Sequence, residues 1–159
     1  MAETNTLGWG RPDVYVKKLG ESEAAWNKLP TPVDGTTSLT TTQGEKMEAK
    51  IEGGDNEAVK YKANTYELSL QIRLTPEKED ELSVIQDVDG VVAGEYSVMV
   101  IPENPAAVGV QIDRASVNVQ TAFGSADGTV NTYTFSALKP ETGNTVKFDV
   151  LTAPSTGEA

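Results

Sequence analysis

The sequence predicts a mainly β protein, an antiparallel β-sandwich or barrel with one short flanking helix. Three observations predict it. Apolar and polar residues alternate along several stretches, which is typical of strands with one dry and one wet face. Turn-forming pairs such as Asp127-Gly128 and Gly143-Asn144 separate these stretches. A single segment, about 76–87, has the start signal and the apolar stripe of a helix.

The longest alternating stretch covers residues 65–74 and predicts the central strand. Its apolar positions are Tyr66, Leu68, Leu70, Ile72 and Leu74, and its polar positions are Thr65, Glu67, Ser69, Gln71 and Arg73. Because successive side chains leave opposite faces of a strand, we expect one face to pack on the core and the other to meet water.

Length and composition limit the possible classes of protein. A chain of 159 residues fits one domain, 1–159, that can bury a core without disulfides. The formal net charge is −11, with 13 basic against 24 acidic residues, so a face that grips nucleic acid is not expected. Residues 1–10 lack the features of a signal peptide, and no apolar run approaches the roughly 20 residues of a membrane helix. We therefore expect no membrane partner.

The first third of the chain is predicted to lead into the central strand. Residues 1–10 form a flexible arm, and Val14 and Val16 mark a strand whose antiparallel partner is 26–29. The hydroxyl-rich segment 36–42 is expected to be an exposed edge or interface strand.

Residues 44–74 are predicted to form a long hairpin, which spans about 33–74 together with the loop before it. The alternating side chains of its first strand are Met47, Ala49 and Ile51 on one face and Glu48, Lys50 and Glu52 on the other. The second strand of the predicted hairpin is 65–74, across a connection of about a dozen residues.

The second half of the chain is predicted to contain the helix and further strands. Thr75-Pro76 followed by acidic residues predicts a helix of about three turns that closes one opening of the sheet structure. The strands that follow are 96–101, 108–112, 115–123, 130–138 and 145–151. Residues 152–159 are predicted to be a flexible tail.

The residue types present argue against catalysis. The chain has no His and no Cys, so the usual nucleophile, general-base and zinc constellations are missing. We expect no enzymatic activity, no cofactor and no metal site. The segment Asp87-Val88-Asp89-Gly90 is similar to the start of a calcium loop but lacks the later ligands, so a plain turn is expected.

Several short strings together resemble tail tube (major tail) proteins of phages and prophages. They are Gly8-Trp9-Gly10-Arg11-Pro12, 26–32, Leu39-Thr40-Thr41-Thr42, 46–54 and Asn64-Thr65-Tyr66. The order of elements is similar over nearly the whole chain. The resemblance implies a small β-sandwich or barrel with one flanking helix, related to the tube proteins of type VI secretion and contractile injection devices.

The resemblance also implies a structural function. Six copies form a ring, and rings stack into a hollow conduit through which DNA passes without specific binding. The implied partners are further copies of the chain and the tail initiator, terminator and tape-measure proteins. The implied location is the tail of the virion, after assembly in the cytoplasm of the bacterial host.

Simple physical reasoning favours the same assembly. A long amphipathic hairpin with unpaired edges can pair with a neighbour, and six such sheets close into one barrel without free edges. The residues expected to face the lumen are Glu48, Lys50, Glu52, Glu67, Gln71 and Arg73. The residues expected at contacts between subunits or rings are Trp9, Thr36, Thr37, Leu39, Thr40, Thr41 and Thr42.

Three alternatives stay open from the sequence. The polar faces of the hairpin can simply be the solvated side of a monomeric sandwich. A carbohydrate- or surface-binding module should expose a row of aromatic residues, and the two tryptophans, Trp9 and Trp26, make no such row. A tube protein of a type VI secretion or contractile injection machine differs from a tail tube mainly in its cargo.

Overall fold

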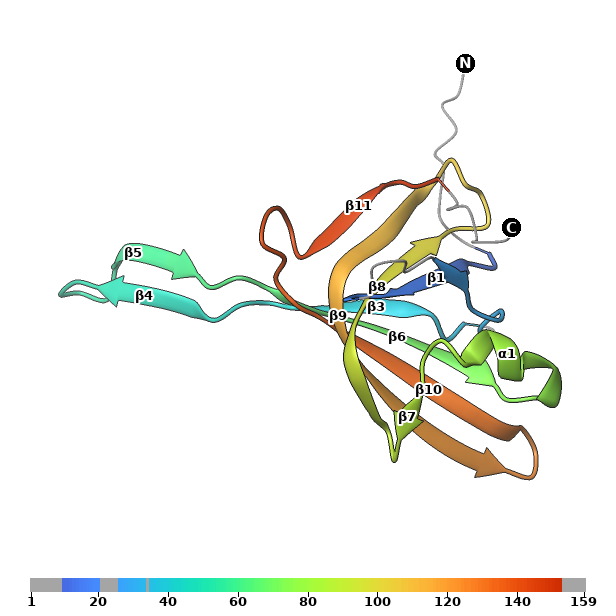
Figure 1. Cartoon of the computed structure of the whole chain (residues 1–159). Coiled ribbons are helices and arrows are strands. Elements are labelled where there is room, and N and C mark those ends of the chain that lie inside the picture. Colours follow the sequence, from blue (N-terminus) through green and yellow to red (C-terminus); the bar gives the residue numbers. More distant parts are fainter. Residues whose placement is uncertain (1–9, 21–25, 34, 153–159) are drawn as a thin grey trace, which may run out of the picture.

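The structure, a computed structural model, contains one large antiparallel sheet, a separate two-stranded sheet and one short helix (Figure 1). It describes residues 10–20, 26–33 and 35–152, of which 57% lie in strands and 5% are helical. The elements are β1 (Asp13–Lys18), β2 (Asn27–Lys28), β3 (Ser38–Thr42), β4 (Lys46–Lys50), β5 (Asn56–Tyr61), β6 (Thr65–Arg73), η1 (Pro76–Lys78), α1 (Glu79–Leu82), β7 (Asp87–Val88), β8 (Val91–Ile101), β9 (Val108–Gly124), β10 (Gly128–Ala137) and β11 (Val146–Val150). The predicted mainly β fold with one short helix is confirmed.

The large sheet has nine strands and is antiparallel throughout. Its order is β2-β1-β8-β9-β10-β6-β3, with β7 added to β8 and β11 added to β9. The strand pair predicted near the N-terminus is β1 with β2, in which Tyr15 lies opposite Lys28. Strand β6 lies between β3 and β10, so it is an interior strand, but it is one position from the edge, and the predicted central position belongs to β9.

The sheet curves around one main hydrophobic core (Figure 1). Leu68, Leu70 and Ile72 of β6 are fully buried, and Phe135 of β10 lies directly opposite Leu68. The alternating polar positions of β6 are exposed or half-buried, which confirms the predicted dry and wet faces. Residues 96–101 of β8 are all buried, as the sequence predicted for that apolar run.

Two predicted strands, 108–112 and 115–123, are one continuous strand, β9. Tyr96 lies opposite Ala115 and Val98 lies opposite Ile112, so β9 has one more residue than β8 between these pairs. This β-bulge bends the strand without ending it. The first half of β9 then pairs with β11 and the second half with β10. The predicted break was wrong because a bulge interrupts the alternation of buried residues in the same way as a turn does.

The helix is shorter than the predicted 76–87. It begins at Pro76, and its α-helical part ends at Leu82. The hydroxyl of Ser83 donates a hydrogen bond to the carbonyl of Asp80 at 2.6 Å. The chain then returns to the sheet, because Asp87–Val88 pair with β8 as strand β7.

The predicted apolar stripe of the helix and the predicted turn after it are both found. Leu82 and Ile85 are buried in the main core. The N–H of Gly90 donates to Asp87 Oδ2 at 2.9 Å, and Gly90 has a φ of 85°. The Asp87 to Gly90 segment is therefore the plain turn that the sequence predicted.

Candidate assembly surfaces

The chain from β3 to β6 is one long two-stranded ribbon. Ser38 lies opposite Ser69 and Thr42 opposite Thr65 in the large sheet, whereas Lys46 lies opposite Tyr61 and Ala49 opposite Ala58 in the small one. Between these pairs, each residue gained along β3 and β4 corresponds to one residue lost along β5 and β6. The pairing therefore runs in a single register through both sheets. The predicted pairing of β4 with β6 was wrong, because β4 pairs with β5.

The outer part of this ribbon, residues 44–63, projects from the body and is called the finger below (Figure 1). At its root, the N–H of Gly44 donates to Asn64 Oδ1 at 3.0 Å. A Cβ at Gly44 would collide with the carbonyl oxygen of Lys62, so only glycine allows this close approach of the two strands. At its tip, Gly53 and Gly54 both have positive φ and make the turn.

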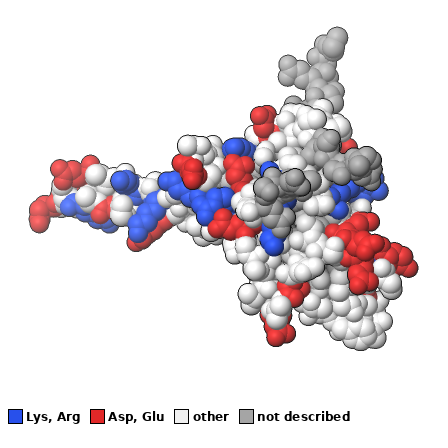
Figure 2. All heavy atoms as spheres, viewed as in Figure 1, with Lys and Arg blue, Asp and Glu red and all other residues white. Residues whose placement is uncertain are grey.

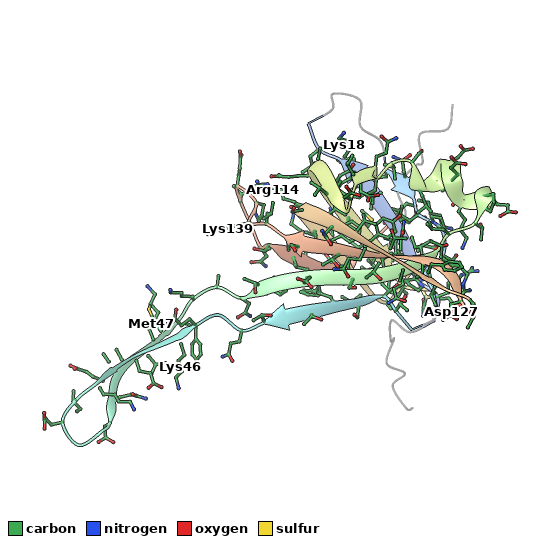
Figure 3. The ribbon with its side chains drawn as sticks, turned by 90° about the horizontal axis from the view of Figure 1, so that it is seen from below. Lys18, Lys46, Met47, Arg114, Asp127 and Lys139 are labelled. Carbon is green, nitrogen blue, oxygen red and sulfur yellow. The ribbon has the colours of Figure 1, made fainter. Side chains whose placement is uncertain are left out.

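Water surrounds both faces of the finger. Every residue from 45 to 63 is exposed. Four large apolar side chains have 41–51% of their surface exposed: Met47, Ile51, Val59 and Tyr61. Figure 3 shows Lys46 and Met47 on the finger, away from the body of the protein. A two-stranded hairpin alone in water is marginally stable at best, so the finger adds little stability of its own.

The two faces of the finger differ in chemistry. Lys46, Glu48 and Lys50 share one face, where Glu48 forms ion pairs with Lys46 at 2.7 Å and with Lys50 at 3.8 Å. The hydrogen bond to Glu48 raises the pKa of Lys46. Tyr61 and Val59 lie on this same face, opposite Lys46 and Glu48. On the other face, Met47 lies opposite Lys60 and Ala49 lies opposite Ala58. The alternation predicted for the first hairpin strand is therefore found in the structure.

The residues predicted to face a lumen are not brought together. Glu48 and Lys50 lie on the finger, and Glu52 lies in the turn at its tip. Glu67, Gln71 and Arg73 lie on β6 in the large sheet. The physical reason is the register of the ribbon, which places β4 beyond the end of β6 and not beside it.

Two of the β6 residues already have partners within the chain. Arg73 Nε donates to the carbonyl of Asp127 at 3.0 Å, which ties β6 to the turn between β9 and β10. The N–H of Gln71 donates to Thr36 Oγ1 at 3.2 Å, and its carbonyl accepts from the N–H of Val33 at 2.7 Å. Glu67 is exposed on the outer face of β6.

The residues predicted to contact other subunits or rings divide into four groups. Trp9 lies outside the described residues. Thr36 stabilises its own chain, because its hydroxyl also donates to the carbonyl of Val33 at 2.7 Å, and Leu39 packs against the main core. Thr40, Thr41 and Thr42 are exposed on β3, which is an edge strand of the large sheet, as predicted for 36–42. Thr37 is half-buried beside a cavity.

Sequence reasoning missed this cavity and the apolar surface next to it. The cavity has a volume of about 660 Å³, and its apolar lining includes Val100, Val108 and Val110. On the neighbouring strand β11, Phe148 and Val150 each have 54% of their surface exposed. The alternation of 145–151 predicts a strand, but a strand with a buried face and one with an exposed apolar face have the same pattern.

Charge is distributed unevenly over the molecule. Figure 2 shows acidic side chains gathered over η1 and α1, whereas acidic and basic side chains are mixed on the finger. The charged residues of the finger are Glu45, Glu48, Glu52, Asp55 and Glu57 against Lys46, Lys50, Lys60 and Lys62. The finger is therefore nearly neutral, and the rest of the chain has almost all of the net charge of −11.

Comparison with known proteins does not assign the chain to a family. No protein-family model matches the sequence, and no curated protein matches it significantly. In the part of the chain that the structure describes, no group of three or more acidic side chains is arranged to hold a metal ion. Among these same residues, no helix has the length and apolar character needed to cross a bilayer.

Proposed function

We propose that the chain is the structural subunit of a phage or prophage tail tube, in which six copies form a ring and rings stack into a hollow conduit for DNA. The observation that carries the proposal is the finger. It extends the sheet well beyond the core and exposes apolar side chains on both faces, as Met47 and Val59 illustrate. An assembly that covers either face removes apolar side chains from water, whereas a monomer does not.

The energetics favour a closed assembly over a single contact. Full burial of one large apolar side chain contributes about 1.5–3 kcal/mol. Association of two copies costs about 4–15 kcal/mol in lost freedom of motion. One finger on one neighbour therefore gives a weak pair. In a ring each copy both donates a finger and receives one, so every copy gains two contacts.

The step from a ring to a tail tube comes from the resemblance described above. On this proposal the partners are further copies of the chain and the tail initiator, terminator and tape-measure proteins, and the location is the virion. The acidic character of the chain supports a conduit for DNA, because a wall with an excess of acid repels phosphates and lets the strand slide.

Negative-stain microscopy of the concentrated protein tests the proposal. We expect rings of six subunits, and tubes made of stacked rings when a tail initiator complex is added. Particles that stay monomeric at high concentration, with and without an initiator, contradict it.

A further inference from the structure

An apolar surface lies beside the cavity, on β9 and β11. The receiving face, as we call it, consists of Val108 and Val110 of β9 with Phe148 and Val150 of β11. Phe148 lies opposite Val110, and Val150 lies opposite Val108, so the four side chains share one side of the sheet. Further along the same two strands, Ile112 and Val146 are buried in the main core. The receiving face is thus a continuation of the core into solvent.

The receiving face lacks a cover in the part of the chain that the structure describes. Val108, Phe148 and Val150 have 54–56% of their surface exposed. Strand β11 pairs with β9 alone among the described strands, so its other edge is free. An exposed apolar patch beside a free edge strand is typical of an interaction surface.

We propose that the apolar face of the finger of one copy covers the receiving face of a second copy. This inference rests on the proposed function, because it names the surface that the finger needs. The apolar side chains of this face are Met47, Ala49, Ile51 and Ala58, and Lys60 lies on the same side, opposite Met47. Ala49 and Ala58 are the smallest of these and lie directly opposite each other, so they form a saddle between Met47 and Ile51.

Shape supports this pairing of surfaces. A shallow hollow of about 200 Å³ lies at the saddle and is lined by Met47, Ala49, Ala58, Glu48 and Lys60. Phe148 is the largest side chain of the receiving face and protrudes from an edge strand. The saddle can therefore receive Phe148 of the second copy. The face of the finger with Lys46 and Glu48 then stays in water together with Val59 and Tyr61, so the ion pairs of Glu48 are not desolvated.

Charge also favours this orientation. The turn at the tip of the finger has acidic side chains, Glu52 and Asp55. The cavity beside the receiving face is lined by Arg11, whose side chain is exposed. When the finger lies on the receiving face with its tip towards the cavity, these acidic groups approach this arginine.

The geometry makes the contact heterologous. The finger and the receiving face are different surfaces of one chain, so each copy can donate a finger to one neighbour and receive a finger from another. Such contacts form rings when the rotation closes and filaments when it does not.

Cysteine pairs test the contact cleanly, because the chain has no cysteine of its own. The test variant combines Ala58→Cys with Phe148→Cys, and its controls are the two single variants. A matched control pair combines Ala58→Cys with Phe123→Cys, since Phe123 is also an exposed phenylalanine, at 79%. All these positions are exposed, so folding is expected to be unchanged.

We expect mild oxidation of the assembled test variant to give a ladder of covalent multimers on a non-reducing gel. The single variants should give dimers at most, and the control pair should give no ladder. Assemblies that are visible by microscopy without a ladder from the test pair overturn the receiving face but leave the proposed function standing. A disulfide within one chain also overturns it. Failure of any variant and of the unmodified protein to assemble overturns both.

A second comparison does not depend on disulfide geometry. We expect Phe148→Ala to raise the concentration needed for assembly roughly tenfold or more, because a large apolar contact is lost. Phe123→Ala should change it less than about twofold. Equal effects of the two substitutions contradict the proposal.

Residues 1–9 are a competing occupant, because the described chain begins at Gly10, which also lines the cavity. A variant with Trp9→Cys and Val108→Cys distinguishes residues 1–9 from the finger of a second copy as the occupant. Efficient formation of this disulfide within one chain assigns the surface to residues 1–9 and overturns the proposal. A ladder from the Ala58 and Phe148 pair in a variant that lacks residues 1–9 supports it.

Discussion

Two phenylalanines show how position along a strand, and not residue type, decides burial. Phe135 of β10 lies opposite Val117 and is fully buried, whereas Phe123 lies near the end of β9 and is 79% exposed. Both occupy apolar positions of an alternating stretch. The sequence could therefore predict the strands but not that the hairpin of β9 and β10 extends beyond the core.

This difference gives a prediction for stability. Phe135→Ala should lower the free energy of unfolding by about 3–5 kcal/mol, because it removes buried surface and leaves a cavity. Phe123→Ala should change it by less than about 0.5 kcal/mol. Urea unfolding followed by circular dichroism measures both values, and similar losses for the two variants would contradict the described core.

A second residue-scale prediction concerns Glu95 and Arg114, which meet at the bulge of β9. Arg114 Nε and Nη2 donate to the two carboxylate oxygens of Glu95 at 2.8 and 2.9 Å. This hydrogen bonding lowers the pKa of Glu95 below its ordinary value of 4.5. A carboxylate whose pKa is lowered in the folded state adds stability above its unfolded pKa, and that stability disappears as the pH falls through the folded pKa.

The difference in the free energy of unfolding between the unmodified protein and Glu95→Gln should therefore depend on pH. At pH 7 the variant should be the less stable of the two, and the difference should shrink as the pH falls below 4.5. The control is Glu67→Gln, on the exposed outer face of β6. Denaturant unfolding at several pH values measures the difference, and a difference that is constant over the whole range would exclude the expected role of the ion pair.

At the scale of elements, the finger is the part whose pairing sequence reasoning could not predict. Strands β4 and β6 both alternate strongly, so the sequence favoured their pairing. Strand β5 between them is exposed at every position and resembled a connection. When both strands are exposed, the burial of their side chains does not determine the register. The register of the finger is therefore set by the turn at Gly53 and Gly54 and by the close approach of the strands at Gly44.

The finger should be dispensable for folding and essential for assembly. Replacing residues 45–62 with Asn-Gly joins two positions that already face each other across the ribbon. Since none of the removed side chains is buried, the free energy of unfolding should change by less than about 1 kcal/mol. Light scattering should show that the shortened protein no longer assembles. A shortened protein that is unfolded, or one that still assembles, would contradict the role given to the finger.

At the scale of the whole molecule, net charge opposes association. Each copy has a formal charge of −11, so copies repel one another over a distance that salt shortens to about 8 Å at physiological ionic strength. We expect the concentration needed for assembly to fall as sodium chloride is raised from low to physiological levels. If light scattering instead shows that salt dissolves the assemblies, ion pairs dominate the contacts and the apolar contact of the finger does not.

The central claim is that the chain is built to join further copies in a closed ring. Sedimentation velocity over a wide range of concentrations tests it most directly, because it separates monomers, closed dimers and rings by size. We predict a transition from monomers to hexamers, with larger stacks at the highest concentrations and little dimer. A protein that remains monomeric throughout, or that stops at a closed dimer, would contradict the claim.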